Sequence, residues 1–208
     1  MKAYWTKRFK NEGMIWGDQP SKTAEIAKQL FEQYEARKIL VPGGGYGRNT
    51  KLFSASDFEV DAIEISEEAI HIAKEWDKKT HFYHGSVFEM PFSFELYDAI
   101  YCYDVIHLFL AEERKLLIDK CFNQLKENGY LFFTCFSELE DDFGKGNQVE
   151  ENTFESKPGK IVHYFTEEDL KHHFKEGHII ETGIVEDTLY YSSGDIRKYY
   201  LRYIFVKK

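Results

Sequence analysis

The fold is decided by the stretch Ile39-Leu40-Val41-Pro42-Gly43-Gly44-Gly45-Tyr46-Gly47-Arg48-Asn49, in which an apolar strand runs into a glycine-dense turn. Glycine adopts positive φ without strain and has no Cβ, so a ligand can lie against the backbone where the next helix begins. The next apolar run, residues 58–66, ends in Glu64, seventeen positions after Gly47. In a doubly wound sheet these two places are neighbours, and a carboxylate there accepts hydrogen bonds from ribose hydroxyls. The sequence therefore predicts a nucleoside site.

The spacing of the glycines distinguishes two kinds of nucleoside. The dinucleotide fingerprint G-x-G-x-x-G, aligned from Gly43, needs a small residue at position 48, where this chain has Arg48. The chain has G-x-G-x-G instead, at Gly43, Gly45 and Gly47. An NAD-dependent oxidoreductase is therefore the weaker alternative.

The G-x-G-x-G turn and Glu64 resemble the first two motifs of class I S-adenosylmethionine-dependent methyltransferases, whose cofactor has a ribose and an adenine but no phosphate. Later segments resemble further family motifs in order and spacing, namely 82–87 (third motif), 97–104 (fourth strand) and 125–133 (L-K-P-G-G turn and fifth strand). The opening segments 4–9, 15–17 and 20–21 resemble the N-terminal arm of the tellurite-resistance and thiopurine methyltransferase branch. The chain departs from the family at Val41, where an acid is usual, at Pro42, which has no amide hydrogen, and at Ser86, where aspartate is common.

The resemblance implies a set of contacts with S-adenosylmethionine. They are Gly43, Gly45 and Gly47 under the methionine part, Glu64 on the ribose diol, Ile65, Ser86 and Val87 around the adenine, and Arg8 and Trp16 at the cofactor carboxylate. Arginine suits that last role because it makes strong charge-assisted hydrogen bonds to carboxylates. The alternative for Trp16 is packing within the arm, and for Ser86 and Val87 it is helix capping and core packing.

The resemblance also implies which residues lie near the transferred methyl group. Tyr103 and Asp104 end the predicted fourth strand and would lie beneath the cofactor sulfur, with plain packing as the alternative for the tyrosine. His107 is a candidate general base, because the unperturbed pKa of histidine lies near neutrality. A thiol or chalcogen anion as acceptor would need no base, so the acceptor and the use of a base stay open.

Strand and helix patterns alternate along the chain. Strands are predicted at 38–42, 58–64, 81–84, 97–103 and 130–136, with helices at 21–33, after Arg48, at 66–76 and at 112–125. Two further predicted strands, 179–186 and 199–206, are joined by a connection too short and polar for a crossover helix, so they should pair antiparallel. The sequence predicts an α/β fold: a Rossmann-like, doubly wound, seven-stranded, mostly parallel sheet with an antiparallel C-terminal strand.

A single methyltransferase domain is expected over residues 1–208, because a chain of this length that is 43% apolar can bury one sizeable core. Residues 1–20 are its predicted N-terminal arm. The polar segment 137–163 is predicted to be an irregular insert over the acceptor pocket, since ligands of open α/β sheets bind outside the carboxyl ends of the strands. A surface loop without a role is the alternative for that insert.

Composition narrows the possible partners. The 27 basic and 36 acidic residues give a net charge of −9, which would repel a nucleic-acid backbone. The sequence has neither the apolar core of a signal peptide nor an apolar run of about 18 residues, so we expect a cytoplasmic protein without membrane contact. The three cysteines form no C-x-x-C pair, and the adjacent His172 and His173 point to different sides of a helix, so no metal is expected.

Three functions stay open at the level of sequence. The first is a methyltransferase that converts S-adenosylmethionine to S-adenosylhomocysteine while it methylates a small molecule, acting as a monomer or homodimer. The second is a non-catalytic sensor of S-adenosylmethionine or another nucleoside, which could carry substitutions such as Val41 and Ser86. The third, an NAD-dependent oxidoreductase, is disfavoured by Arg48.

Overall fold

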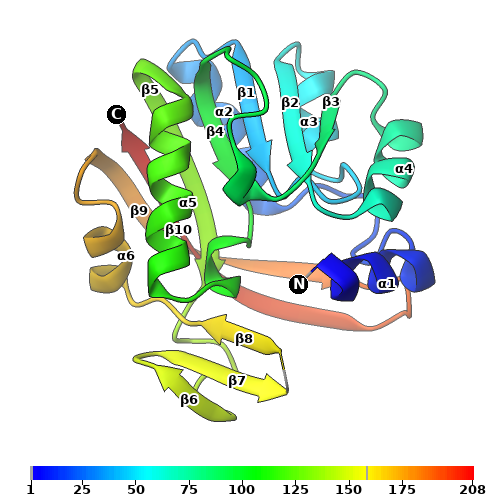
Figure 1. The fold of residues 1–208 in the computed structure, drawn as a ribbon, viewed down its shortest axis with the longest axis vertical. Helices are drawn as coiled ribbons and strands as arrows, with labels where there is room; N and C mark the ends of the chain where they lie inside the picture. Colours follow the sequence, from blue (N-terminus) through cyan, green and yellow to red (C-terminus); the bar gives the residue numbers. More distant parts are fainter. Residues whose placement is uncertain (1, 158) are drawn as a thin grey trace.

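A central sheet of seven strands organises the computed structural model, which describes residues 2–157 and 159–208 (Figure 1). Its strands lie in the order β3-β2-β1-β4-β5-β10-β9. They are β1 (Lys38–Pro42), β2 (Glu59–Glu64), β3 (His81–His84), β4 (Tyr97–Cys102), β5 (Leu125–Phe136), β9 (His178–Tyr190) and β10 (Ile196–Lys207). The helices are α1 (Lys2–Glu12), α2 (Lys22–Gln33), α3 (Thr50–Ala55), α4 (Glu67–Trp76), α5 (Ala111–Gln124) and α6 (Glu167–His173), with 3-10 turns η1 (Val87–Glu89) and η2 (Ile106–Leu108). Met1 of the predicted arm and Pro158 of the predicted insert lie outside the described residues.

Alternate residues of the central strands divide the core between the two faces of the sheet. Ile39 and Val41 of β1 pack on one face with side chains of α2, α3 and α4. Leu40, between them, packs on the opposite face with side chains of α5 and α6. Helices therefore cover both faces, which confirms the predicted doubly wound architecture.

The direction of the strands also agrees with the sequence. Strands β1 to β5 pair in parallel, whereas β10 runs antiparallel between β5 and β9. Pairing of β9 with β10 continues as far as Tyr190 and Ile196, so both strands are longer than predicted. The polar connection is consequently reduced to a turn of five residues, 191–195, in which Gly194 has φ 90°.

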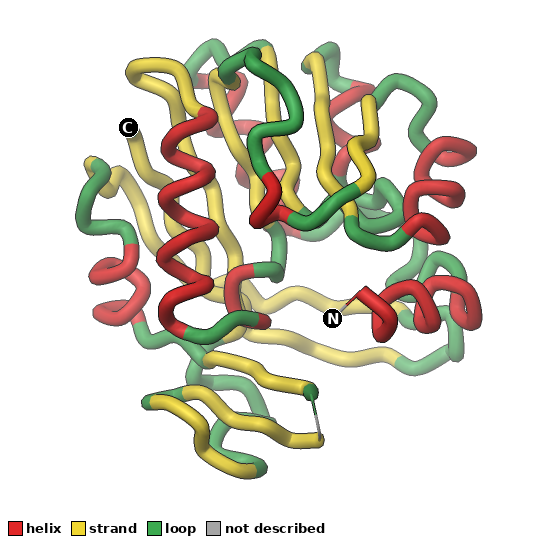
Figure 2. The backbone as a smooth tube through the Cα atoms, in the orientation of Figure 1, coloured by secondary structure: helices red, strands yellow, loops and turns green. Residues whose placement is uncertain are grey.

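The extended tip of the β9–β10 hairpin passes beneath the carboxyl ends of the parallel strands, as Figures 1 and 2 show. Helix α1 lies beside this tip in the view of Figure 1 and packs against α4. The arm is joined to the hairpin by a hydrogen bond from the Ser192 amide to the Ile15 carbonyl, at 2.9 Å. The edge of the sheet where ligands of this fold class bind is therefore enclosed from below.

The prediction that residues 137–163 form an irregular insert is wrong. The segment contains an antiparallel sheet of three strands, β6 (Asn147–Glu150), β7 (Thr153–Lys157) and β8 (Lys160–His163). The strands are short and mostly polar, which is why their pattern was not recognised in the sequence. Glu150 accepts a hydrogen bond from the Ala111 amide at 3.1 Å, so this sheet is attached to the start of α5.

Other expectations can be compared with the described residues. The side chains of Cys102, Cys121 and Cys135 are buried and unpaired, and burial raises the pKa of each thiol. Over residues 2–157 and 159–208, no helix is long and apolar enough to cross a membrane. In the same residues no group of three histidine, cysteine or acidic side chains is arranged to hold a metal ion.

Candidate active site

The glycine turn after β1 lies at the carboxyl edge of the sheet. Gly43, Gly45 and Gly47 all have positive φ, at 72°, 56° and 86°. The Gly43 amide donates to the Ile63 carbonyl of β2 at 2.8 Å, which fixes the turn beside the end of that strand. A Cβ on Gly43 would lie 2.4 Å from Val105 Cγ2, whereas among the described residues a Cβ on Gly45 would meet only Phe9 Cζ, at 3.9 Å. The protein itself therefore crowds Gly43 but leaves space over Gly45.

Glu64 ends β2 and its carboxylate faces this turn. Oε2 accepts a hydrogen bond from the Gly45 amide at 2.9 Å, and Oε1 accepts one from the Ser66 amide at 2.8 Å. The residue is 6% exposed, and burial raises the pKa of the carboxyl group against the opposing effect of these amides. The structure thus brings together the two features from which the sequence predicted a nucleoside site.

The residues predicted to surround the adenine follow the ends of β2 and β3. Ser86 is the N-cap of η1, where its hydroxyl accepts from the Phe88 amide at 3.2 Å. Glu89 in turn accepts from the Ser86 amide at 2.9 Å, which completes a capping box. Val87 is buried in the core, and Ile65 is half-buried. Capping and packing, the alternatives for Ser86 and Val87, are therefore present, and the Ser86 hydroxyl hydrogen is still available to a ligand.

Tyr46, which the sequence analysis did not select, connects the arm to the glycine turn. Its side chain is 1% exposed, and its hydroxyl donates to the Gly17 carbonyl at 2.7 Å and accepts from the Trp16 amide at 3.2 Å. The rings of Trp16 and Tyr46 stack with centroids 6.1 Å apart. A large aromatic residue between two glycines of a turn was the signal for this role.

Arg8 lies on α1 with its guanidinium against aromatic rings of the arm. Its Nε is 3.2 Å from Glu12 Oε1, and its guanidinium carbon lies 5.8 Å from the Trp5 ring and 5.4 Å from the Trp16 ring. Among the predicted contacts, Trp16 is therefore joined to the glycine turn through Tyr46, whereas Arg8 is engaged within α1.

Asp104 is the titratable group at the end of β4. It has φ 54°, and its Oδ1 accepts a hydrogen bond from Thr134 Oγ1 at 2.7 Å. Desolvation raises the pKa of this carboxyl group to about 7, although the Thr134 hydrogen bond opposes the change. A carboxyl group that titrates near neutrality at a strand end is a candidate for proton transfer. Its neighbour Tyr103 is half-buried, and the Tyr103 hydroxyl is buried without a hydrogen-bond partner in the described residues.

His107 occupies a different environment from the one expected of a general base. Its ring is 3% exposed and stacks on Phe136, with centroids 4.0 Å apart. Nδ1 accepts from the Phe136 amide at 3.4 Å, and burial lowers the pKa of the imidazole to about 3. This geometry favours a neutral imidazole ring that packs against Phe136. Asp104 is therefore the better candidate for a general base.

The donor set at this edge fits a nucleoside better than a dinucleotide. The Glu64 carboxylate has lone pairs beyond those that accept from the Gly45 and Ser66 amides, so it can also accept from ribose hydroxyls. Ile65 and Val87, which follow the ends of β2 and β3, supply apolar atoms that could contact an adenine. At position 48, where a pyrophosphate-binding turn requires a small residue, Arg48 is 7% exposed and extends toward Gln19 and Tyr103.

Comparison with known proteins agrees with this geometry. Residues 40–133 match the family model described as a methyltransferase domain; the match runs from within β1 to within β5 and so includes the glycine turn, Glu64 and Asp104. No curated protein matches the chain.

Several solved structures share the fold. A SAM-dependent methyltransferase from Methanosarcina mazei is similar with a TM-score of 0.73 and 21% identity, over 86% of this chain and 96% of that one. The 1,6-didemethyltoxoflavin-N1-methyltransferase of Burkholderia thailandensis, with bound S-adenosylhomocysteine, is similar with a TM-score of 0.74 and 15% identity, over 100% of this chain and 86% of that one. TehB from Haemophilus influenzae is similar with a TM-score of 0.64 and 22% identity, over 100% of this chain and 66% of that one. Residues 40–133 thus match a methyltransferase-domain model, and the chain has the fold of these solved S-adenosylmethionine-dependent methyltransferases.

Proposed function

We propose that this protein transfers the methyl group of S-adenosylmethionine to a nucleophilic atom of a small molecule and releases S-adenosylhomocysteine. The observation that carries the proposal is the contact between the Glu64 carboxylate and the Gly45 amide, 2.9 Å, which joins the ribose-binding acid to the glycine turn. The methyltransferase-domain match over residues 40–133 and a fold neighbour that holds S-adenosylhomocysteine support the choice of cofactor.

The cofactor supplies an activated methyl group on a sulfonium, so the chemistry needs an in-line approach of the acceptor lone pair as the S–CH3 electron pair returns to sulfur. The protein's part is to bind, orient and exclude water. In our proposal Glu64 holds the ribose diol, Gly43, Gly45 and Gly47 let the backbone approach the methionine part, and Ile65, Ser86 and Val87 surround the adenine. Trp16, held by Tyr46, closes the site from the arm, and Arg8 is proposed to pair with the cofactor carboxylate.

Asp104 is proposed to accept the proton that an O–H, N–H or S–H acceptor loses. Its carboxyl pKa of about 7 allows it to be ionised at neutral pH while it is still basic enough to take a proton. Thr134, which donates to it, would hold the carboxylate in position. Tyr103, with its unpartnered hydroxyl, is proposed to contact the acceptor, and His107 is proposed to pack against Phe136 rather than act as a base.

The class of acceptor is a small molecule in this proposal, with a thiol or chalcogen anion among the candidates. The narrower relation to the tellurite-resistance branch has limited support, a TM-score of 0.64 and 22% identity to TehB. One domain over residues 1–208, with the 137–163 segment beside the acceptor pocket and a monomeric or homodimeric protein, completes the proposal.

The test is binding followed by turnover. Calorimetric titration with S-adenosylmethionine, S-adenosylhomocysteine and NAD should give binding of the first two only. Release of S-adenosylhomocysteine should then be measured across a panel of thiol, oxyanion and amine acceptors. Binding without release for every acceptor would favour a sensor, and binding of NAD alone would refute the proposal.

A further inference from the structure

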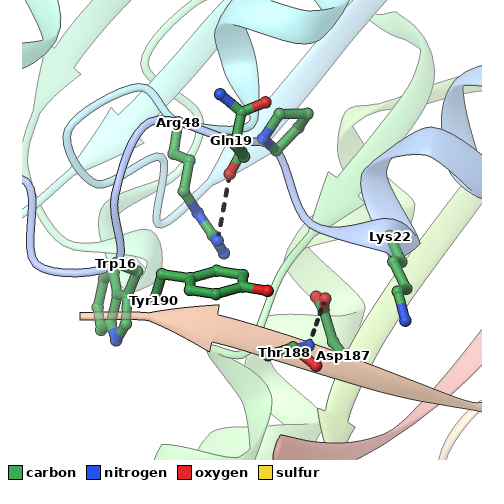
Figure 3. A pocket seen from close by; sticks show the side chains of 8 residues that line it. Trp16, Gln19, Lys22, Arg48, Asp187, Thr188 and Tyr190 are labelled. Atoms are coloured by element: carbon green, nitrogen blue, oxygen red, sulfur yellow. Dashed lines mark hydrogen bonds between the residues drawn. The ribbon is translucent and has the colours of Figure 1, made fainter. Parts of the chain in front are cut away.

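A cavity of about 290 Å³ lies between the arm and the tip of the β9–β10 hairpin, separate from the adenine and ribose contacts proposed above (Figure 3). Its lining residues are Trp16, Gln19, Pro20, Lys22, Arg48, Asp187, Thr188 and Tyr190. Arg48 follows the glycine turn directly, so the cavity adjoins the proposed cofactor site. Its volume is at the small end of the range for ligand pockets, which suits a compact molecule.

Arg48 contributes to this cavity a guanidinium group that has few hydrogen-bond partners among the described residues. Its side chain is 7% exposed, and its one hydrogen bond within the described residues runs from Nη1 to the Gln19 carbonyl, at a long 3.4 Å. The guanidinium carbon lies 5.3 Å from the centroid of the Tyr103 ring. Among residues 2–157 and 159–208, no carboxylate lies within 4.0 Å of the guanidinium to form an ion pair. Since a guanidinium has five N–H donors, most of them have no protein acceptor.

Asp187 brings a complementary acceptor to the same cavity. It is 4% exposed, and its Oδ1 accepts from the Thr188 amide at 2.9 Å. Its Oδ2 is buried without a partner in the part of the chain that the structure describes. An unpaired buried polar atom costs on the order of 1–3 kcal/mol, so a ligand that supplied a donor here would recover that cost.

We propose that this cavity binds a small carboxylate that also carries a hydrogen-bond donor, with the carboxylate on Arg48 and the donor on Asp187. The inference rests on the proposed function, because it makes this molecule the methyl acceptor. An arginine fork matches a carboxylate in geometry and charge. Trp16 and Tyr190 give the cavity aromatic walls against which an apolar part can pack.

The charges around the cavity favour this class over two others. A dianion such as a phosphate ester would meet the Asp187 carboxylate, and a simple amine would meet the Arg48 guanidinium. The second cation at the rim, Lys22, already donates from Nζ to the Glu186 carbonyl at 2.7 Å. Among the described residues that line the cavity, the Arg48 guanidinium and the unpartnered Asp187 Oδ2 therefore define the ligand's polar groups, and the Lys22 ammonium adds a positive charge at the rim.

The test uses four matched probes of similar size: L-phenylalanine, phenyllactate, phenylpropionate and phenylethylamine. Each is titrated calorimetrically into the full chain with and without saturating S-adenosylhomocysteine. L-phenylalanine or phenyllactate should bind, phenylpropionate should bind more weakly because it has no donor for Asp187, and phenylethylamine should not bind. The first two probes distinguish an amino donor from a hydroxyl donor.

Three variants assign the binding to the cavity. Arg48→Gln should weaken the binding of the carboxylate probes at least about tenfold. Asp187→Asn should remove most of the preference for L-phenylalanine and phenyllactate over phenylpropionate. Lys115→Gln, which changes an exposed lysine of α5 outside the cavity lining, is the control and should change the affinities less than about twofold. Melting temperature and S-adenosylhomocysteine affinity are recorded for each variant. If Arg48→Gln does not fold, Arg48→Lys, which keeps the charge without the fork, replaces it.

Several results would overturn the inference. They are binding of none of the carboxylate probes, equal binding of phenylethylamine, or unchanged affinity in Arg48→Gln and Arg48→Lys. Competition between the carboxylate probes and S-adenosylhomocysteine would also overturn it, because the cavity would then hold the cofactor's own amino-acid end. Failure of the proposed function is measured separately: S-adenosylhomocysteine would then not bind, or S-adenosylmethionine would bind without release of S-adenosylhomocysteine for any acceptor, whatever the affinities of the probes.

Discussion

Replacement of Asp104 by asparagine should stabilise the fold at high pH and abolish a pH-dependent step of catalysis. Asparagine keeps an oxygen that can accept from Thr134 Oγ1 but removes the titrating carboxyl group. Burial raises the pKa of that group from 3.8 to about 7, so the folded state holds its proton over a pH range in which the unfolded state has lost it. The wild-type protein should therefore lose stability as the pH rises from about 4 to about 7.

The size of the effect follows from the same two pKa values. Their difference, at 1.36 kcal/mol for each pKa unit, corresponds to at most roughly 4 kcal/mol, fully present above pH 7 and absent below pH 4. Urea denaturation of both proteins at a series of pH values measures it. The free energies of unfolding should agree at low pH, and Asp104→Asn should become the more stable protein as the pH rises. Parallel curves across the whole range would refute the reasoning.

The catalytic part of this prediction uses His107 as the matched control. For an acceptor that must lose a proton, kcat/KM should rise with pH around a midpoint near 7, and Asp104→Asn should lose that rise. His107→Gln should keep the midpoint, because the imidazole pKa of about 3 lies far below it. A midpoint that moves in His107→Gln but not in Asp104→Asn would assign the base to the histidine.

Three further predictions test the parts that hold the site in place. Tyr46→Phe removes two hydrogen bonds to the arm. It should lower the free energy of unfolding by about 1–2 kcal/mol and weaken the binding of S-adenosylhomocysteine, and thermal shift measures both effects. An unchanged melting curve would contradict this. Asp77→Ala leaves the hydroxyls of Thr50, Ser54 and Thr80 without their shared acceptor and should cost about 3 kcal/mol in urea denaturation, whereas an exposed acid on α4 should be replaceable at no cost. Gly43→Ala should cost more stability than Gly45→Ala, because both strain a positive φ but only the first places a Cβ 2.4 Å from a side chain; equal losses would be evidence against the crowding.

Much of the fold was predictable because it depends on local patterns. The buried parallel strands are continuous apolar runs, and the glycine turn and Glu64 have a fixed separation in a strand-turn-helix-strand unit. The insert was not predictable in this way. Its strands carry few apolar residues, and they are stabilised by contacts such as the one from Glu150 to the start of α5, which are distant in sequence.

The candidate site was predictable where it depends on backbone and not where it depends on side-chain environment. Histidine at position 107 has a suitable intrinsic pKa, but burial, which only the folded chain reveals, lowers the pKa to about 3. Asp104 has an unsuitable intrinsic pKa that desolvation raises to about 7. Arg48 counted in the sequence only as a departure from the dinucleotide pattern, whereas in the fold it lines a cavity opposite a residue 139 positions away, Asp187.

The central claim is that Glu64 and the glycine turn bind the ribose of the methyl donor. Calorimetric titration of S-adenosylhomocysteine into wild-type protein and Glu64→Gln tests it, with Glu67→Gln, an exposed acid at the start of α4, as the control. Glu64→Gln should bind S-adenosylhomocysteine more weakly by over about 1.5 kcal/mol, or more than about tenfold, while Glu67→Gln should bind it like the wild type. Equal affinity of Glu64→Gln and wild-type protein, with both folded, would contradict it.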